Sequence, residues 1–434
     1  MTDAPRPPPD PAHPVVPATT RSHTTKPPAI LLIAPNGSYR TAPFLSAAAQ
    51  LGVETIIASE SEYPLVAMGQ GAVRVNFARP DEALARLLAA GTDRRIVAAI
   101  GTADVSTALA AHWDFPHNDI ESTRIARRKD HARACLSRAG VRVPAHRRID
   151  LHAELTQQFA GLDFPVVLKP IALSASRGVM RADDVPGLMR ACARLSTILR
   201  EVPDPDERRY ALIESFVPGF EVAVEGLLVA GELQVLALFD KPDPLDGPFF
   251  EETYYITPSR LPIVRQHDIA REVQAACRAY GLREGPVHAE CRVNDTGVWI
   301  LEVAARTIGG LCGRLLRFGT GHSLEELVLK HAMRMPIAHE RMTDAAGVLM
   351  IPIPGAGILR RIEGLPAAER VPYIEEVNIQ VREGYELIPL PEGATYLGFI
   401  FARAPTPAQA ETALRAAHAQ LRIVLSPLWK ASVA

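Results

Sequence analysis

The stretch GPVHAECRVNDTGVWILEV (285–303) decides how the chain is interpreted. Apolar and polar residues alternate on both sides of Asp295-Thr296-Gly297, and this alternation predicts two antiparallel strands joined by a tight loop. A three-residue loop would place Gly297 at the position that needs a left-handed backbone. In that register Asn294 lies opposite Val298, and the pairing of every residue further along the hairpin follows from it.

Two carboxylates face each other in this predicted hairpin. The register pairs Glu290 with Glu302 on one face, while the other face carries Ala289, Cys291, Val293, Leu301 and Val303. Opposed carboxylates repel each other at a cost of ~0.2–1 kcal/mol. A divalent cation such as Mg²⁺, which prefers oxygen ligands, removes that cost. The alternative is a solvated outer face on which the pair is harmless.

Two lysines precede this hairpin in the chain. Lys129 lies in a polar helical stretch, and Lys169 ends the apolar run FPVVLKP (164–170). The small polar residues of 173–178 follow Lys169, and such a loop can bring backbone N–H groups and hydroxyls against phosphate oxygens. The spacing differs from the GxxxxGK[ST] loop of other nucleotide-binding proteins. A surface lysine beside a flexible turn is the alternative for either residue alone.

A third candidate is ESFVPGFE (214–221), in which a strand ends, a turn follows at Pro218-Gly219 and a new strand begins. Backbone groups of the hinge 214–217 could pair with a flat base, and Glu221 could accept hydrogen bonds from ribose hydroxyls. A plain connection between two strands is the alternative.

The first part of the chain predicts a parallel sheet, because short apolar runs alternate with helical segments. The expected strands are 29–35, 53–59 and 95–101, and the expected helices are 41–52 and 104–113. The turn after the first strand, NGSYR (36–40), contains only Gly37. A dinucleotide fingerprint needs three spaced glycines, so the sequence gives little support for such a site.

The pattern changes after residue 116. A long polar helix is expected over 117–140, and strands with a hairpin turn at Ala230-Gly231 are expected over 160–240 around a helix at 184–199. The segment 240–262 contains five prolines and predicts an irregular functional loop. The remaining expectations are helices at 266–282 and 323–333, and from about 345 an α+β unit that ends in a helix and a strand.

Composition excludes several classes of protein. The 434 residues are 47% apolar and 22% charged with a net charge of −2, which indicates neither a nucleic-acid nor a membrane-surface partner. No apolar run approaches the ~18–20 residues of a membrane helix. The five cysteines have no CxxC spacing, which favours a reducing cytoplasm. Nine prolines in residues 1–28 predict a disordered tail, and that segment lacks the apolar core of a signal peptide.

Taken in order, these features resemble the ATP-grasp superfamily over roughly residues 29–430. The matching stretches are RRKDHARACLSRAGVRVP (127–144), FPVVLKP with ALSASRGV (164–179), LIESFVPGFEVAVEG (212–226), VHAECRV (287–293) and WILEVAARTIGG (299–310). Within the superfamily the chain is most similar to the L-amino acid ligases that make dipeptides, of the bacilysin-synthetase and carnosine-synthase type. The segments 240–262 and 395–421 carry this closer likeness.

The resemblance implies a fold of mixed α/β and α+β class. The expected units are a Pro-rich tail (1–28), an N-terminal open α/β, Rossmann-like domain (29–116), an ATP-binding unit (117–335) with a small mobile lobe at about 160–240, and a C-terminal α+β lobe (336–434). ATP would lie between two antiparallel sheets.

The resemblance also implies roles for individual residues. Lys129 and Lys169 would contact phosphates, and the loop with Ser174, Ser176 and Gly178 would close over them. The hinge with Glu214, Phe216 and Val217 would hold adenine, and Glu221 the ribose. Glu290 and Glu302 would carry Mg²⁺, and Arg306 would face the transferring phosphoryl group and the tetrahedral intermediate.

One position departs from the family pattern. Many members have asparagine two residues after the second metal-binding glutamate, where this chain has Ala304. An alanine side chain cannot ligate a metal, so one Mg²⁺ is expected and the coordination of a second is left open. Candidates for substrate contact by position alone are His288, Arg314, and Glu251 or Glu252. For His288 a structural role beside the hairpin is an equal alternative.

The expected reaction joins a carboxylate and an amine, with amino acids as the expected small-molecule substrates, at the expense of ATP and through an acyl phosphate. Two alternatives stay open at this point: another ATP-grasp ligase of the purine-pathway or carboxylase type, and a nucleotide-binding protein that has lost catalysis. A homodimer is also left open.

Overall fold

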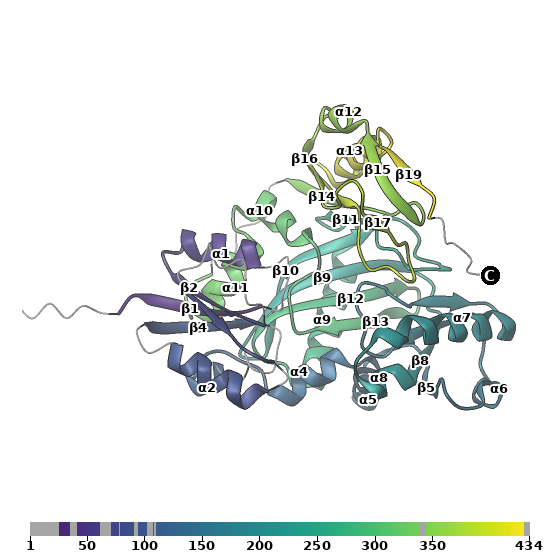
Figure 1. The fold of residues 1–434 in the computed structure, drawn as a ribbon, viewed down its shortest axis with the longest axis horizontal. Coiled ribbons are helices and arrows are strands. Elements are labelled where there is room, and N and C mark those ends of the chain that lie inside the picture. Colours follow the sequence, from purple (N-terminus) through teal and green to yellow (C-terminus); the bar gives the residue numbers. More distant parts are fainter. Residues whose placement is uncertain are drawn as a thin grey trace, which may run out of the picture.

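The computed structural model describes residues 26–34, 41–60, 71–77, 79–90, 94–101, 107, 110–337 and 344–428. Within these ranges the strands form four sheets, of four, eight, three and four strands. Figure 1 shows an N-terminal sheet on the left, a small lobe at the lower right and a C-terminal lobe at the top, with the largest sheet between them. The mixed α/β and α+β architecture expected from the sequence is confirmed.

The N-terminal sheet is parallel, with strand order β3-β2-β1-β4. The short apolar runs form buried strands as predicted, since this sheet is covered on both faces. Residues 36–40, with Gly37, and half of the expected helix 104–113 lie outside the described residues. The elements are β1 (Pro28–Ile33), α1 (Thr41–Gln50), β2 (Glu54–Ser59), β3 (Gly71–Arg74), α2 (Pro80–Ala90) and β4 (Arg95–Gly101).

The small lobe is an antiparallel sheet of order β5-β8-β6-β7 covered by helix α7. Helix α7 (Val185–Ile198) begins where the Asp184 side chain accepts a hydrogen bond from the Gly187 N–H, as helix caps do. The other elements are β5 (His146–Asp150), α6 (Leu155–Gln158), β6 (Val166–Pro170), β7 (Met180–Ala182), a 3₁₀ helix (Leu199–Glu201), α8 (Pro205–Arg209) and β8 (Tyr210–Ser215).

The central sheet has eight strands in the order β13-β12-β9-β10-β11-β14-β18-β16. Ala230 and Gly231 form the turn between β9 and β10 with φ of 52° and 91°, as the sequence predicted. The strands are β9 (Phe220–Val229), β10 (Glu232–Lys241), β11 (Tyr254–Thr257), β12 (Gly285–Asn294), β13 (Gly297–Ala304), β14 (Ala345–Ile351), β16 (Ile374–Ile379) and β18 (Gly398–Ala404).

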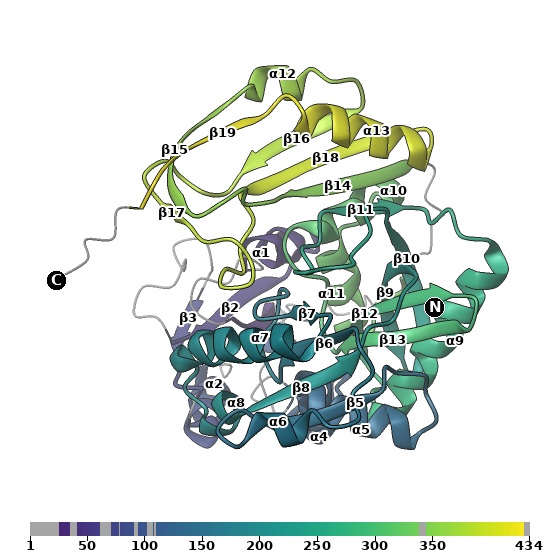
Figure 2. The same ribbon diagram turned by 90° about the vertical axis from the view of Figure 1, so that its right-hand side faces the viewer.

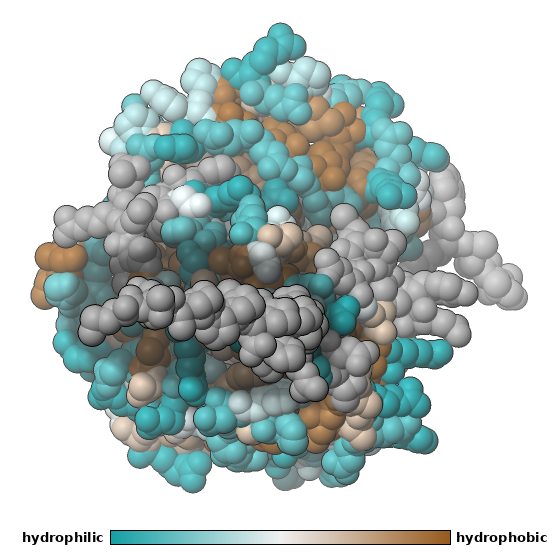
Figure 3. All heavy atoms as spheres, turned by 90° about the vertical axis from the view of Figure 1, so that its left-hand side faces the viewer, coloured by the Kyte–Doolittle hydropathy of each residue, from teal (hydrophilic) through white to brown (hydrophobic). Residues whose placement is uncertain are grey.

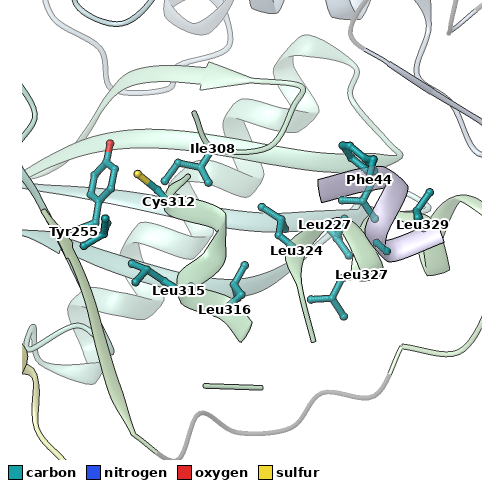
Figure 4. Close-up of a cluster of buried hydrophobic side chains, with 14 of the residues drawn as sticks. Phe44, Leu227, Tyr255, Ile308, Cys312, Leu315, Leu316, Leu324, Leu327 and Leu329 are labelled. Atoms are coloured by element: carbon teal, nitrogen blue, oxygen red, sulfur yellow. The ribbon is translucent and has the colours of Figure 1, made fainter. Parts of the chain in front are cut away.

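Two hydrophobic clusters cover the central sheet. Helices α4 (Ile120–Arg127), α5 (Lys129–Arg138) and α9 (Ile263–Tyr280) pack on the first. The second joins the sheet to α1, to the 3₁₀ helix Cys312–Arg314, and to α10 (Leu315–Thr320) and α11 (Leu324–Ala332). In this second cluster Phe44 of α1 lies near Leu227 of β9 and Leu329 of α11 (Figure 4), so it ties the N-terminal domain to the central sheet.

The C-terminal lobe is continuous with the central sheet. Strands β14, β16 and β18 belong to that sheet, and α13 (Pro407–His418) packs against β14 and β18. A three-stranded sheet of β17 (Glu386–Leu387), β15 (Gly357–Glu363) and β19 (Arg422–Ser426) completes the lobe with α12 (Leu365–Glu369). The predicted final helix and strand are confirmed. Seen from the N-terminal side, hydrophobic side chains gather on this upper lobe (Figure 3).

Three predictions of local structure need correction. The single helix over 117–140 is two helices, because Arg128 has an extended backbone and ends α4 before α5 begins. The segment 240–262 contains the buried strand β11, which the apolar residues of Tyr254–Thr257 pair with β14. Strands over 220–241 belong to the central sheet rather than to the small lobe, because β9 pairs with β12 from Phe220 to Leu228.

Among the described residues, no helix combines the length and the apolar character that crossing a membrane requires.

Replacing Phe44 by alanine tests the attachment of the N-terminal domain. Its side chain is buried in the cluster shared with α11, so Phe44→Ala should lower the free energy of unfolding by about 3 kcal/mol. Urea unfolding followed by circular dichroism measures this. The control Tyr385→Ala removes a side chain from a residue that is 61% exposed and should change stability by less than about 0.5 kcal/mol. Equal effects of the two variants would contradict the role assigned to Phe44.

Candidate active site

A cavity of about 820 Å³ lies where the domains meet. The central sheet forms its floor, and it is also lined by the small lobe, by the C-terminal ends of β1 and β4, and by residues 394–399 of the C-terminal lobe. Eleven of the twelve predicted site residues line it: Lys129, Lys169, Ser174, Ser176, Glu214, Phe216, Val217, Glu221, Glu290, Glu302 and Arg306. Gly178 is not in the lining. Of the substrate candidates, His288 and Glu252 line the cavity.

The hairpin places Glu290 opposite Glu302, as predicted, but its turn and its register differ from the predicted ones. The connecting loop has two residues, so Asn294 pairs with Gly297 and Val293 with Val298. A β-bulge then shifts the register near Glu290 and restores the predicted pair. Because of the bulge, Leu301 lines the cavity instead of joining the hydrophobic face, where the sequence placed it.

Glu290 is surrounded by cationic groups. Its Oε1 lies 3.8 Å from the Lys241 Nζ and 3.5 Å from the His288 Nε2. Although burial alone would raise it, these two cations hold the pKa of Glu290 well below its usual range. Glu290 therefore remains an anion in the floor of the cavity.

Lys241 is a buried ammonium that the sequence analysis did not single out. Its Nζ lies 2.9 Å from the Glu221 Oε1 and also binds Glu252, and the three carboxylates of Glu221, Glu252 and Glu290 converge there. Burial opposes its charge, but the carboxylates outweigh burial and raise the pKa of Lys241 well above its usual value. One signal was available: FDKP (239–242) ends a strand in Lys-Pro, as VLKP does at Lys169.

His288 has a partner on each ring nitrogen. Its Nδ1 lies 3.1 Å from the Glu225 Oε2, and Glu225 is fully buried and also accepts a hydrogen bond from the Ile308 N–H. Burial would lower the pKa of His288, but its hydrogen bonds to Glu225 and Glu290 raise it to about 9. His288 is thus a cation at neutral pH whose position is fixed by Glu225.

Lys129 of α5 pairs with Glu302 on the second strand of the hairpin, β13. The Lys129 Nζ is 3.6 Å from the Glu302 Oε2 and donates a hydrogen bond to the Leu173 carbonyl at 2.7 Å. Burial would raise the pKa of Glu302, but Lys129 leads the groups that lower it. Lys129 therefore joins the hairpin to the start of the loop 173–178.

Lys169 is held by a buried carboxylate. Its Nζ lies 2.7 Å from the Glu214 Oε2, and the other oxygen of Glu214 lies 2.5 Å from the Arg133 Nε. Burial would raise the pKa of Glu214, but Arg133 and Lys169 lower it to about 2. The Glu214 side chain therefore orients Lys169, and only its backbone is available for the base-binding role implied by the family resemblance.

The loop after Lys169 has an unusual backbone. Ala175 and Ser176 have φ of 54° and 53°, a left-handed conformation that non-glycine residues rarely adopt outside functional sites. Gly178 has φ of 75°, and a Cβ there would lie 2.9 Å from the Leu195 side chain. The serines predicted to meet phosphates therefore lie on a loop of defined shape at the cavity wall.

The hinge residues are tied to Arg292. Its Nη1 donates to the Val217 carbonyl at 2.8 Å, its Nε lies 2.9 Å from the Glu221 Oε2, and its guanidinium lies over the Phe216 ring at 5.0 Å. Both carboxylate oxygens of Glu221 thus have a cationic partner, since Lys241 binds the other. Arg292 is a further residue that the sequence analysis missed, because strand alternation alone does not reveal its partners.

Arg306 lies just after β13 and lines the cavity. Its Nη1 donates to the Thr307 carbonyl at 3.0 Å. Arg306 is close enough to Glu302 for its charge to lower the pKa of that carboxyl group.

Comparison with known proteins follows the same division of the chain. The family model described as ATP-grasp domain matches residues 162–314, and that described as L-amino acid ligase C-terminal domain 2 matches residues 349–426. The crystal structure of an L-amino acid ligase from Bacillus licheniformis superimposes with a TM-score of 0.79 at 23% sequence identity, covering 93% of this chain and 100% of that one. At this identity the likeness concerns the fold.

Curated relatives match part of the chain. The uncharacterized protein y4rH of Sinorhizobium fredii is 26% identical over 324 residues, which are 74% of this chain and 65% of that protein. The alanine–anticapsin ligase of Bacillus subtilis is 25% identical over 206 residues (44% and 43%), and the dapdiamide A synthase of Enterobacter agglomerans is 29% identical over 177 residues (39% and 40%). The chain thus spans less than two thirds of the length of each of these relatives. It contains a region that matches the ATP-grasp domain and, after it, a region that matches the C-terminal domain 2 of the L-amino acid ligases.

Proposed function

We propose that this protein is an ATP-dependent carboxylate–amine ligase that joins two amino acids through an acyl phosphate. The observation that carries the proposal is the floor of the cavity, where Glu290 and Glu302 lie opposite each other with Lys129 and His288 beside them. The names of the alanine–anticapsin ligase and the dapdiamide A synthase support amino acids or related compounds as substrates.

The chemistry requires activation of a carboxylate. A carboxylate is a poor electrophile because its leaving group would be oxide. In the proposed first step a carboxylate oxygen attacks the γ-phosphorus of ATP, the bond to the bridging oxygen breaks, and ADP leaves. In the second step an amine attacks the acyl carbon, and inorganic phosphate leaves as the amide forms with loss of a proton. The protein contributes positioning and charge stabilisation, and no protein nucleophile takes part.

The cationic side chains have distinct proposed roles. Lys129 and Lys169 contact the phosphates, and the loop with Ser174, Ser176 and Gly178 covers them. Arg306 faces the phosphoryl group in transit and the oxyanion of the tetrahedral intermediate. The charge on His288, fixed by Glu225, adds to the positive potential where these anions form.

The hinge is the proposed nucleotide-base site. The backbone of 214–217, beside the Phe216 ring, lies against the cavity, and Glu221 lies just beyond it on the same wall. We assign adenine to this hinge and the ribose to Glu221. Arg292 and Lys241 already bind the two oxygens of the Glu221 carboxylate. Glu221 would therefore accept a hydrogen bond from a ribose hydroxyl through the remaining lone pairs of these oxygens.

The donor set suits one Mg²⁺. Glu290 and Glu302 offer oxygen ligands on adjacent strands, and Mg²⁺ is commonly held by one or two carboxylates together with substrate phosphates. When bound, the ion would neutralise charge on the phosphates. Ala304 is buried beside His288 and offers no ligand, so we propose a single ion held by these two glutamates.

The alternatives are less well supported. Structures of phosphoribosylglycinamide synthetase and of a biotin carboxylase domain match at 16% and 17% identity, so their likeness concerns the fold alone. The C-terminal match is to the L-amino acid ligases. A protein that had lost catalysis would have no need of Glu290, Glu302 and Arg306 in one cavity. We also propose a cytoplasmic location, with which the five free cysteines agree.

Glu290→Gln and Glu302→Gln test the metal assignment. Each variant removes one anionic ligand, so Mg²⁺-dependent ADP formation with a mixture of amino acids should fall by at least about 100-fold while the protein stays folded. Glu232→Gln, on the exposed end of β10 in the same sheet, is the matched control and should retain activity. Near-normal turnover in either folded cavity variant would contradict the assignment.

Glu214→Gln tests the carboxylate that orients Lys169. The folded-state pKa of about 2 lies below the unfolded value of 4.5, so ionised Glu214 stabilises the fold above pH 4.5 and this contribution is lost as pH falls toward 2. The difference corresponds to about 3 kcal/mol, of which about two fifths should be lost by pH 3.5. In urea unfolding at pH 5.5 and 3.5, the stability advantage of the wild type over Glu214→Gln should therefore shrink. An advantage that is the same at both pH values would show that Glu214 is not held as an anion.

A further inference from the structure

The C-terminal lobe contacts the loop that carries Ser174 and Ser176. The Gly178 N–H donates to the Pro391 carbonyl at 2.9 Å, and the Arg177 Nε donates to the Glu392 carbonyl at 2.8 Å. These hydrogen bonds join residues more than 200 positions apart in the sequence. In Figures 1 and 2 a yellow-green loop of the C-terminal lobe descends toward α7 of the small lobe.

A charged pair completes this contact. The Arg194 side chain of α7 donates two hydrogen bonds to the Glu392 carboxylate, from Nε to Oε1 at 2.5 Å and from Nη2 to Oε2 at 2.8 Å. The face of the same guanidinium lies over the Phe249 ring at 5.0 Å. Arg194 therefore binds two segments that lie outside the small lobe, and a two-point guanidinium–carboxylate pair fixes orientation as well as distance.

The neighbouring strand has a similar contact. The Arg181 N–H of β7 donates to the Pro248 carbonyl at 2.9 Å, and its Nη1 donates to the Asp246 carbonyl at 2.8 Å. The small lobe is thus attached along one edge, by β7 to residues 246–249, and by α7 and the loop before β7 to residues 391–392. Among the described hydrogen bonds that come from outside the small lobe, only those of 391–392 reach the loop 174–178 directly, while inside the lobe Arg177 also pairs with Glu201 at 2.9 Å.

We propose that Glu392 is a positioning residue, which acts through Arg194 and Arg177 to hold the loop 174–178 over the nucleotide phosphates. This inference rests on the proposed function, because it assigns the loop to phosphates. The hydrogen bond from Gly178 to Pro391 sets the position of the loop, and the Glu392–Arg194 pair holds the two lobes in the orientation that allows it. Closure of this kind keeps water away from a hydrolysable acyl phosphate.

If the Glu392–Arg194 pair only stabilised the fold, its loss would lower the melting temperature. Arg194 and Glu392 are each about two-fifths exposed, and exposed ion pairs add little to global stability. Loss of the pair should therefore leave the melting temperature almost unchanged while the loop opens more often. The Gly178 amide reports this opening directly, since its hydrogen bond crosses between the lobes.

The experiment measures hydrogen exchange of peptides that contain Gly178, without ligand and with ADP and Mg²⁺. Glu392→Gln and Arg194→Met should each raise exchange there about five- to ten-fold, and the double variant should show no more than the larger single effect, because both changes remove one interaction. Arg209→Met, which breaks an exposed pair with Asp150 inside the small lobe, is the matched control and should stay within about two-fold of wild type.

The outcomes separate this inference from the proposed function. Exchange at Gly178 that is unchanged in both single variants, or equally raised in Arg209→Met, would overturn the positioning role. If ADP and Mg²⁺ fail to protect the wild-type loop, the assignment to phosphates fails even where the exchange of the ligand-free variants behaves as expected. With a pair of amino acids that supports amide formation, Glu392→Gln should consume at least about three times more ATP per amide than wild type. An unchanged ratio would count against the positioning role.

Discussion

The fold depends on a cluster of carboxylates that are buried beneath the cavity and are each matched with a cation or hydrogen-bond donor. A buried charge without a partner is far too costly to persist, so each of these groups fixes the position of another. Glu214 holds Arg133 and Lys169, Glu221 holds Lys241 and Arg292, and Glu225 holds His288. Strands β8, β9, β10 and β12 bring most of these groups together. Three of these strands belong to the central sheet, so the floor of the site lies on that sheet.

This arrangement also prepares the site for anionic ligands. The cations around Glu290 and Glu302 are held in place before any nucleotide arrives, so little reorganisation is required when negative charge enters the cavity. In the absence of a metal ion, Lys241 and Lys129 neutralise the carboxylates. Under the proposed function, Lys129 would exchange its carboxylate partner for a phosphate when the nucleotide binds.

Much of this could be predicted from the sequence where the signal was local. Alternation predicted the hairpin with Glu290 opposite Glu302, and the apolar runs predicted the parallel sheet, because side-chain periodicity and burial act over a few residues. The turn was predicted with one residue too many, and the pair emerged only because a β-bulge compensates for that error. Bulges depend on packing against other strands, so the orientation of Leu301 toward the cavity could not be predicted from local alternation.

The remaining residues of the site are defined by contacts across long stretches of chain. Arg133 reaches Glu214 from α5, Arg292 reaches Val217 and Glu221 from β12, and Glu392 reaches Arg194 from the C-terminal lobe. Nothing within a short window distinguishes these charged residues from others on the surface. The same limit applies to the break at Arg128 between α4 and α5, where the backbone leaves the helix so that Lys129 can donate its N–H to Ile171 of the small lobe.

The central claim, that a carboxylate is activated by phosphorylation, can be tested by isotope transfer. Pairs of amino acids are first screened for ADP formation with mass detection of the product, and the amino acid that supplies the carboxyl group is then labelled with ¹⁸O in both carboxyl oxygens. The account predicts one ¹⁸O atom in the inorganic phosphate that is released for each amide formed, and none in the nucleotide. Amide formation with unlabelled phosphate, or with ¹⁸O in AMP, would contradict it.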